Sequence, residues 1–280
     1  MVPVDRSGDS ARLAEGHRVV TGRAARGVTL ELDADAVAAG SSIGGRVSGR
    51  DGPATIALLR IEESPTGVFA FNVGSCGIDV RDGASRFELD VPAALPPQAT
   101  GRRCTLHYAV RAAWRLSRWS RRQTVAAIAV RPGERAVHES GGRLDRIIPS
   151  QPGRNFHLEL VDALLEGGGQ LAGRVHRDPG CEERAFLVTA VCEEVWCTNF
   201  RFRTRRSPLL WEVQQLWSTS LTVPLTAGDN WGGFRFDIPG ELPQATEGRV
   251  IAWRYSVEAR PAARRPFPDR AVLTPLRFEV

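Results

Sequence analysis

The residues best suited to binding chemistry are arginines that alternate with aromatic residues near position 200. The arginines are Arg201, Arg203, Arg205 and Arg206, and Phe200 and Phe202 lie among them. In a strand, this alternation places the phenylalanine rings on one face and the first two arginines on the other. Because planar guanidinium groups suit phosphate or carboxylate groups, we expect a hairpin whose turn presents arginine to a partner. The alternative is a solvated hairpin balanced by nearby glutamates, namely Glu182, Glu183, Glu193 and Glu194.

A second stretch interleaves tryptophan with arginine. It comprises Trp114, Arg115, Arg118, Trp119, Arg121 and Arg122. Such residues stack on nucleic-acid bases or lie at lipid headgroups, and both types also anchor protein interfaces. We therefore expect this stretch to contribute to partner binding. The alternative places Trp114 and Leu116 in the core and leaves the arginines solvated.

Catalytic and metal-binding patterns are weak in this sequence. The metal candidates are Cys181, Cys192, Cys197 and His176. A closed zinc site needs four convergent ligands, and the odd separation of Cys192 and Cys197 places them on opposite faces of a strand. We find no nucleophile elbow, phosphate loop or paired carboxylates. We therefore expect no catalytic residue, cofactor or metal, and a protein that is not an enzyme.

Composition bounds the class of partner. All 37 basic residues are arginine, and the net charge of the 280-residue chain is +5. This balance permits an acidic partner but is too mild to require nucleic acid. Together with richness in alanine and glycine, the absence of lysine also indicates a GC-rich genome.

The cysteines and the N-terminal region indicate the compartment. Five cysteines without a paired framework indicate reducing conditions. Residues 1–27 are polar, lack the pattern of a secretory signal and are expected to form a flexible arm. No apolar run reaches membrane-spanning length. We expect a cytoplasmic protein without a transmembrane segment; the sequence leaves its oligomeric state open.

The elements that must position these residues are strands, and they occur in two copies. Residues 87–112 and 234–259 match without a gap at a constant offset of 147. Each copy has alternating apolar residues ending in proline, then Leu-Pro, then a strand containing Tyr-x-Val-x-Ala. An earlier pair of strands repeats at an offset of 128, so the second copy carries an insertion that includes the arginine hairpin. The repeat predicts two tandem β domains.

We expect an all-β chain of two antiparallel β-sandwiches. The boundaries predicted from composition are an arm at 1–27, a first domain at 28–133, a linker at 134–153 and a second domain at 154–280. Within the first domain, Gly67 to Ile78 is expected to form a hairpin through Gly74. Within the second, strands are expected from Phe186 to Phe202 and from Leu209 to Leu221.

The repeated sequence, Phe-x-Phe/Leu-x-Ile/Val-Pro followed by Leu-Pro and Tyr-x-Val-x-Ala, resembles that of arrestin-like domains. The arrestin-like fold is similar to an immunoglobulin-like sandwich. Bacterial arrestin-like segments are also similar to three stretches of the second copy, Leu187–Glu194, Leu210–Glu212 and Ile251–Trp253. The resemblance implies a non-catalytic adaptor or scaffold that binds a protein partner. The alternative function is binding to phospholipid headgroups or nucleic acid through the Arg/Trp stretches. Both tyrosines lie in the repeated strands, so the chain lacks the PPxY motif by which some arrestins recruit ubiquitin ligases.

Overall fold

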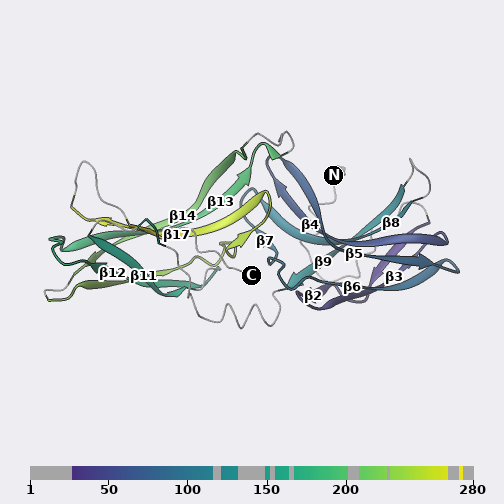
Figure 1. The fold of residues 1–280 in the computed structure, drawn as a ribbon, viewed down its shortest axis with the longest axis horizontal. Coiled ribbons are helices and arrows are strands. Elements are labelled where there is room, and N and C mark those ends of the chain that lie inside the picture. The colour runs from purple at the N-terminus through teal and green to yellow at the C-terminus, as the bar shows by residue number, and fades with distance from the viewer. Residues whose placement is uncertain are drawn as a thin grey trace. The chain divides into compact units, whose positions relative to one another are not determined.

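The computed structural model describes residues 27–115, 121–131, 149–151, 155–163, 167–200, 208–225, 228–263 and 271–273. Regular structure in these residues is almost entirely β-strand, arranged in four sheets whose strand pairs are antiparallel with one exception (Figure 1). The prediction of an all-β chain is confirmed. The chain divides into two compact units, and each is described by itself. The predicted N-terminal arm lies outside the described residues, apart from Gly27.

Unit 1 contains strands β1 to β9 in two sheets. The smaller sheet has the order β1-β3-β6, with β1 at Thr29–Leu32, β3 at Ser42–Ser48 and β6 at Ala84–Asp90. The larger has the order β2-β9-β8-β4-β5, with β2 at Ala36–Ala38, β9 at Arg121–Arg131, β8 at Thr105–Arg115, β4 at Gly52–Ser64 and β5 at Gly67–Val80. Strand β7, at Ala99–Thr100, pairs with β8, and β2 pairs with β9 in parallel.

Unit 2 contains strands β10 to β18, also in one smaller and one larger sheet. The smaller sheet has the order β11-β12-β15, with β11 at Phe156–Ala163, β12 at Gln170–Arg177 and β15 at Trp231–Asp237. The larger has the order β10-β18-β17-β13-β14, with β10 at Pro149–Gln151, β18 at Ala271–Leu273, β17 at Ile251–Pro261, β13 at Ala185–Cys197 and β14 at Trp211–Pro224. Strand β16, at Thr246–Glu247, pairs with β17.

Alternating apolar residues join the two sheets of unit 2 over one core. Phe156 of β11 lies against Phe186 of β13, with 4.7 Å between the ring centroids. Tyr255 and Val257 of β17 belong to the same cluster. Each strand presents one face to this core, because successive side chains alternate. Burial of a large apolar side chain contributes about 1.5–3 kcal/mol, so these rows provide much of the stability of the unit.

The strand registers confirm the repeat. In the smaller sheets, Leu30 pairs with Val47 in unit 1, and Leu158 pairs with Val175 in unit 2, which keeps the offset of 128. In the larger sheets, the repeated tyrosines of β8 and β17 keep the offset of 147. Only residues 65 and 66 connect β4 to β5, whereas residues 198–210 connect β13 to β14. Most of the insertion therefore lies at the turn of the β13–β14 hairpin.

The two repeated tyrosines make the same buried hydrogen bond. Tyr108 donates its hydroxyl to the carbonyl oxygen of Pro96 at 2.6 Å, and Tyr255 donates to that of Pro243 at 2.8 Å. Both tyrosines are almost completely buried. Burial raises the pKa of both phenols. Each hydroxyl thus fixes a Leu-Pro loop against its larger sheet, as a buried phenol requires a partner.

A glycine faces a phenylalanine ring at the same place in each smaller sheet. Gly45 of β3 pairs with Phe87, and Gly173 of β12 pairs with Phe234. A Cβ atom at either glycine would overlap that ring. The side of the strand left open by glycine therefore accommodates the ring in both units.

Some predicted boundaries differ from the structure. Gly67 to Ile78 is not a hairpin but part of the single strand β5, and Gly74 lies at a register shift opposite Leu58. Glycine inside a strand commonly marks a bulge, which is the physical reason for the error. Strand β10 falls within the predicted linker, and β13 ends at Cys197 rather than at residue 202.

We predict equivalent stability losses when either tyrosine hydroxyl is removed. Tyr108→Phe and Tyr255→Phe each leave a buried proline carbonyl without its donor, which costs about 1–3 kcal/mol. Urea unfolding of each variant against the parent chain measures the loss. Tyr255→Ala serves as the comparison, because loss of the ring as well costs about 3–5 kcal/mol. Unchanged stability in both phenylalanine variants would contradict a structural role for the bonds.

Candidate partner-binding surface

Strand β14 forms one edge of the larger sheet of unit 2. It is 14 residues long and pairs with β13 from Trp211 to Pro224 (Figure 1). Among the strands that the structure describes, none pairs with the other side of β14. An open edge presents a row of backbone N–H and C=O groups to which another chain can pair.

The other described sheet edges carry features that oppose such pairing. Strands β2 and β10 are only three residues long, and β5 contains glycines at positions 67, 74 and 77. The remaining edges carry charges in their sequences, which are Glu31 in β1, Arg86, Glu88 and Asp90 in β6, Glu159 and Asp162 in β11, and Arg235 and Asp237 in β15. In β14 the only charged residue is Glu212, next to its first residue. Since charges and short lengths protect edges, β14 is the least protected of them.

A bulge at Leu216 divides the outward face of β14 into two chemically different halves. Cys192 pairs with Trp217 and Glu193 with Gln215, so Leu216 is the extra residue. Before the bulge, the residues facing away from the core include Trp211 and Val213. After it, the outward residues are Ser218, Ser220 and Thr222.

Three large apolar side chains are exposed at the start of β14. Leu210 and Val213 each keep 55% of their surface exposed, and Trp211 keeps 40%. We call these three residues the β14 apolar cluster. The other exposed large apolar residues that the structure describes, Val125, Val161 and Trp231, lie on other strands. Contiguous exposed apolar residues mark interaction sites more often than isolated ones do.

Asn199 holds the base of the β13–β14 connection. Its side-chain amide donates to the carbonyl of Pro208 at 2.9 Å, and its side-chain oxygen accepts from the backbone N–H of Leu210 at 2.9 Å. The N–H of Thr198 also donates to the carbonyl of Leu210 at 2.9 Å. These bonds fix the backbone of Leu210 and therefore the position where the β14 apolar cluster begins.

The predicted arginine sites fall largely outside the described residues. This applies to Arg201, Arg203, Arg205 and Arg206, to Arg118 and Trp119, and to the side chains of Arg115 and Arg121. Trp114 is described and is 3% exposed, and its indole donates to the carbonyl of Arg50 at 3.1 Å. Because it packs in the core of unit 1, Trp114 does not belong to a binding surface, which corrects that prediction. Arg122 is exposed on β9.

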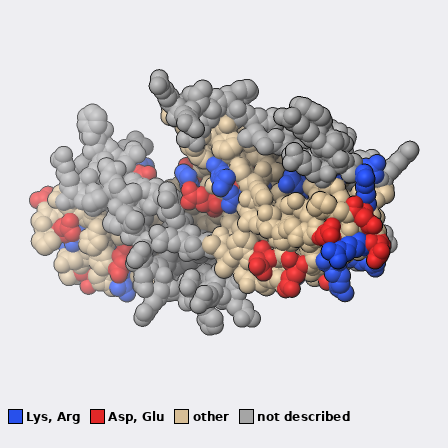
Figure 2. All heavy atoms as spheres, turned by 45° about the vertical axis from the view of Figure 1, so that its right-hand side comes forward, with Lys and Arg blue, Asp and Glu red and all other residues tan. Residues whose placement is uncertain are grey.

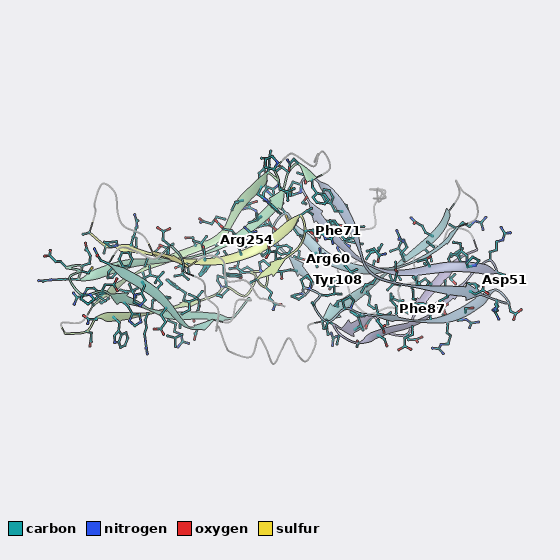
Figure 3. The ribbon with its side chains drawn as sticks, viewed as in Figure 1. Asp51, Arg60, Phe71, Phe87, Tyr108 and Arg254 are labelled. Atoms are coloured by element: carbon teal, nitrogen blue, oxygen red, sulfur yellow. The ribbon has the colours of Figure 1, made fainter. Side chains whose placement is uncertain are left out.

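Two buried carboxylates were missed by the sequence prediction. Glu62 pairs with Leu106, and Glu194 pairs with Trp253, so they occupy equivalent register positions, and both are 0% exposed. The Nε atom of Arg60 lies 2.8 Å from a carboxylate oxygen of Glu62. Figure 3 labels Arg60 near Phe71, whose ring centroid is 5.6 Å from its guanidinium carbon.

In unit 2 the equivalent carboxylate has a different partner. The indole of Trp253 donates to Glu194 at 3.2 Å. Glu194 is therefore a buried carboxylate and not an exposed one. Glu62 and Glu194 lie opposite equivalent residues of the tyrosine-bearing strands. This equivalence is visible only once the pairing register of those strands is known.

The metal candidates are dispersed. Among the described residues, no group of three His, Cys, Asp or Glu side chains is placed to hold a metal ion. His176 instead stacks on His157 across β11 and β12, with ring centroids 4.9 Å apart, and its Nε2 atom lies 2.7 Å from Glu159. This exposed polar group lies on the outer face of the smaller sheet of unit 2.

The comparisons with known proteins do not assign the chain to a family. No protein-family model matches it, and no curated protein matches it. In the described part of the chain, we find no helix with the length and apolar character needed to cross a lipid bilayer.

We predict that the thiol of Cys192 is unreactive in the folded chain. Burial raises its pKa to about 11, although a hydrogen bond with the hydroxyl of Tyr255 acts in the opposite direction. Because the thiolate is the reactive form, alkylation at pH 8 should modify the half-buried Cys181 well before Cys192. Mass spectrometry of iodoacetamide-treated protein measures both sites, with urea-unfolded protein as the control. Equal labelling rates in the folded chain would contradict the buried position of Cys192.

Proposed function

We propose that the chain is a non-catalytic adaptor or scaffold of the cytoplasm, built from two tandem arrestin-like, immunoglobulin-like β-sandwich domains, that binds a protein partner. Two observations support this architecture. Each unit pairs a three-stranded with a six-stranded sheet, and each retains the tyrosine hydrogen bond to its Leu-Pro loop. The repeated motifs that resemble arrestin-like domains lie in these strands.

The exposed β14 apolar cluster is the observation that carries the proposal. Leu210, Trp211 and Val213 remain accessible at the start of a long and almost uncharged edge strand. Tryptophan is a frequent anchor of protein interfaces, since it buries a large rigid area when a partner covers it. Neighbouring apolar side chains and an open edge favour a protein partner over a small molecule.

The described charges give less support to the polyanion alternative. Several arginines lie beside carboxylates, as in the pairs Arg81–Asp79, Arg86–Asp33 and Arg235–Asp237. On the face drawn in Figure 2, blue and red groups of the described residues lie next to one another. Mixed charges weaken the potential that attracts nucleic acid or anionic lipid.

We predict that the double variant Trp211→Ser, Val213→Ser loses its protein partner and keeps its fold. Both side chains are exposed, so the melting temperature should change little. Affinity purification from the native host with quantitative mass spectrometry measures what each variant retains. Trp231→Ser is the matched control, because Trp231 is 44% exposed but lies on β15 in the other sheet. If the parent chain, the double variant and the Trp231→Ser variant retained the same host proteins equally, the binding surface would lie away from β14.

A further inference from the structure

We propose that β14 binds an extended segment of the partner protein as an additional strand of the larger sheet of unit 2. This inference rests on the adaptor function proposed above and specifies its mode of recognition. In strand addition, backbone hydrogen bonds provide affinity and alternate side chains provide specificity. Three properties of β14 support this mode: its long edge without charge, glycine or proline from residue 213 to 223, the chemistry of its two halves, and its poor match to a second copy of itself.

The edge is long enough to pair with a strand on either side of the bulge at Leu216. Residues 213–223 contain no charged residue, no glycine and no proline, and they include two valines, two threonines and one tryptophan. Such residues favour extended backbone. The opposite side of β14 pairs with β13 along its whole length, which holds the edge in a conformation ready for pairing. A short extended segment of the partner therefore meets a preformed template.

The outward face of β14 defines the side chains that a partner strand should carry. Opposite Trp211 and Val213, apolar side chains at alternate positions would cover surface that is now exposed. Opposite Ser218, Ser220 and Thr222, hydroxyl or amide side chains would match the polar row. Thr189 of β13 already shows this chemistry, because its hydroxyl lies 2.8 Å from that of Ser220. The expected ligand is an extended segment that is apolar at one end and rich in serine or threonine at the other.

A second copy of the chain fits the edge less well. Antiparallel pairing of two β14 strands must place side chains of the same face opposite one another. Because of the bulge at Leu216, pairing along most of the edge then sets the apolar half of one copy opposite the polar half of the other, for example Trp211 opposite Thr222 and Val213 opposite Ser220. Each apolar side chain would face a hydroxyl. A partner with an independent sequence avoids this mismatch.

The test uses nine-residue peptides selected from a random displayed library on the immobilised full-length chain. The most enriched peptide is synthesised with each backbone N–H methylated in turn, and binding is measured by fluorescence anisotropy. Strand addition predicts an alternating pattern, in which methyl groups on the bonded edge weaken binding about tenfold or more, equivalent to about 1.4 kcal/mol, and those on the other edge change it less than about twofold. A pattern without alternation, or no enriched peptide, would overturn the inference.

Protein variants locate the binding site. Ser218→Lys introduces an edge charge at an exposed position and should abolish peptide binding, whereas Asn155→Lys adds the same charge at an exposed position before β11 and should leave it unchanged. Equal binding by both variants would overturn the assignment to β14. Sedimentation equilibrium of the free chain provides a further check, because a dimer abolished by Ser218→Lys would make a second copy the occupant and overturn the proposed one.

The outcomes separate this inference from the proposed function. A host protein that is lost with Trp211→Ser and Val213→Ser but retained by Ser218→Lys would support an adaptor that binds through side chains alone, and strand addition would be wrong. If no host protein depends on the β14 apolar cluster and the selected peptide still shows the alternating pattern, the edge is a strand acceptor and the proposed natural surface is wrong.

Discussion

An antiparallel sheet leaves a row of unpaired backbone groups at each edge. The described edges of these two units differ in how well they are protected against pairing with another chain. Most described edges are short, charged or broken by glycine, whereas β14 offers residues 213–223 without a charge. Such an edge can pair with other chains and promote aggregation unless a partner occupies it. The exposed residues Leu210, Trp211 and Val213 extend the same surface, so edge and side chains together indicate where a partner binds.

The duplicated units show what the fold requires and where it has diverged. Tyr108 and Tyr255 keep their bonds to proline carbonyls, which attach a loop to each larger sheet. The buried carboxylates Glu62 and Glu194 are also retained, yet one lies beside Arg60 and the other accepts from an indole. The main difference in length lies in the β13–β14 connection, at the end of the edge that carries the β14 apolar cluster. The added length therefore coincides with the surface that we propose for binding.

Alternation and the internal repeat predicted the all-β structure, because one buried face per strand leaves a clear period of two. The same pattern could not distinguish a turn from a bulge at Gly74, since glycine suits both. Trp114 was predicted at a surface, but its packing depends on strands that are distant in the sequence. The position of β14 at a sheet edge could not be predicted from local sequence patterns, because strand order is a property of the whole sheet. The arginine sites and the domain boundaries stay predictions.

The most direct test of the central claim is amide hydrogen exchange along β14 in the free, full-length chain, resolved by residue with NMR. An open edge predicts an alternating pattern from Trp211 to Val223, in which amides bonded to β13 exchange slowly and those facing outward exchange rapidly. The amides of β13, which has a strand on each side, should all exchange slowly. Slow exchange at every β14 amide in the free chain would contradict the account, because it would show that the edge is already occupied.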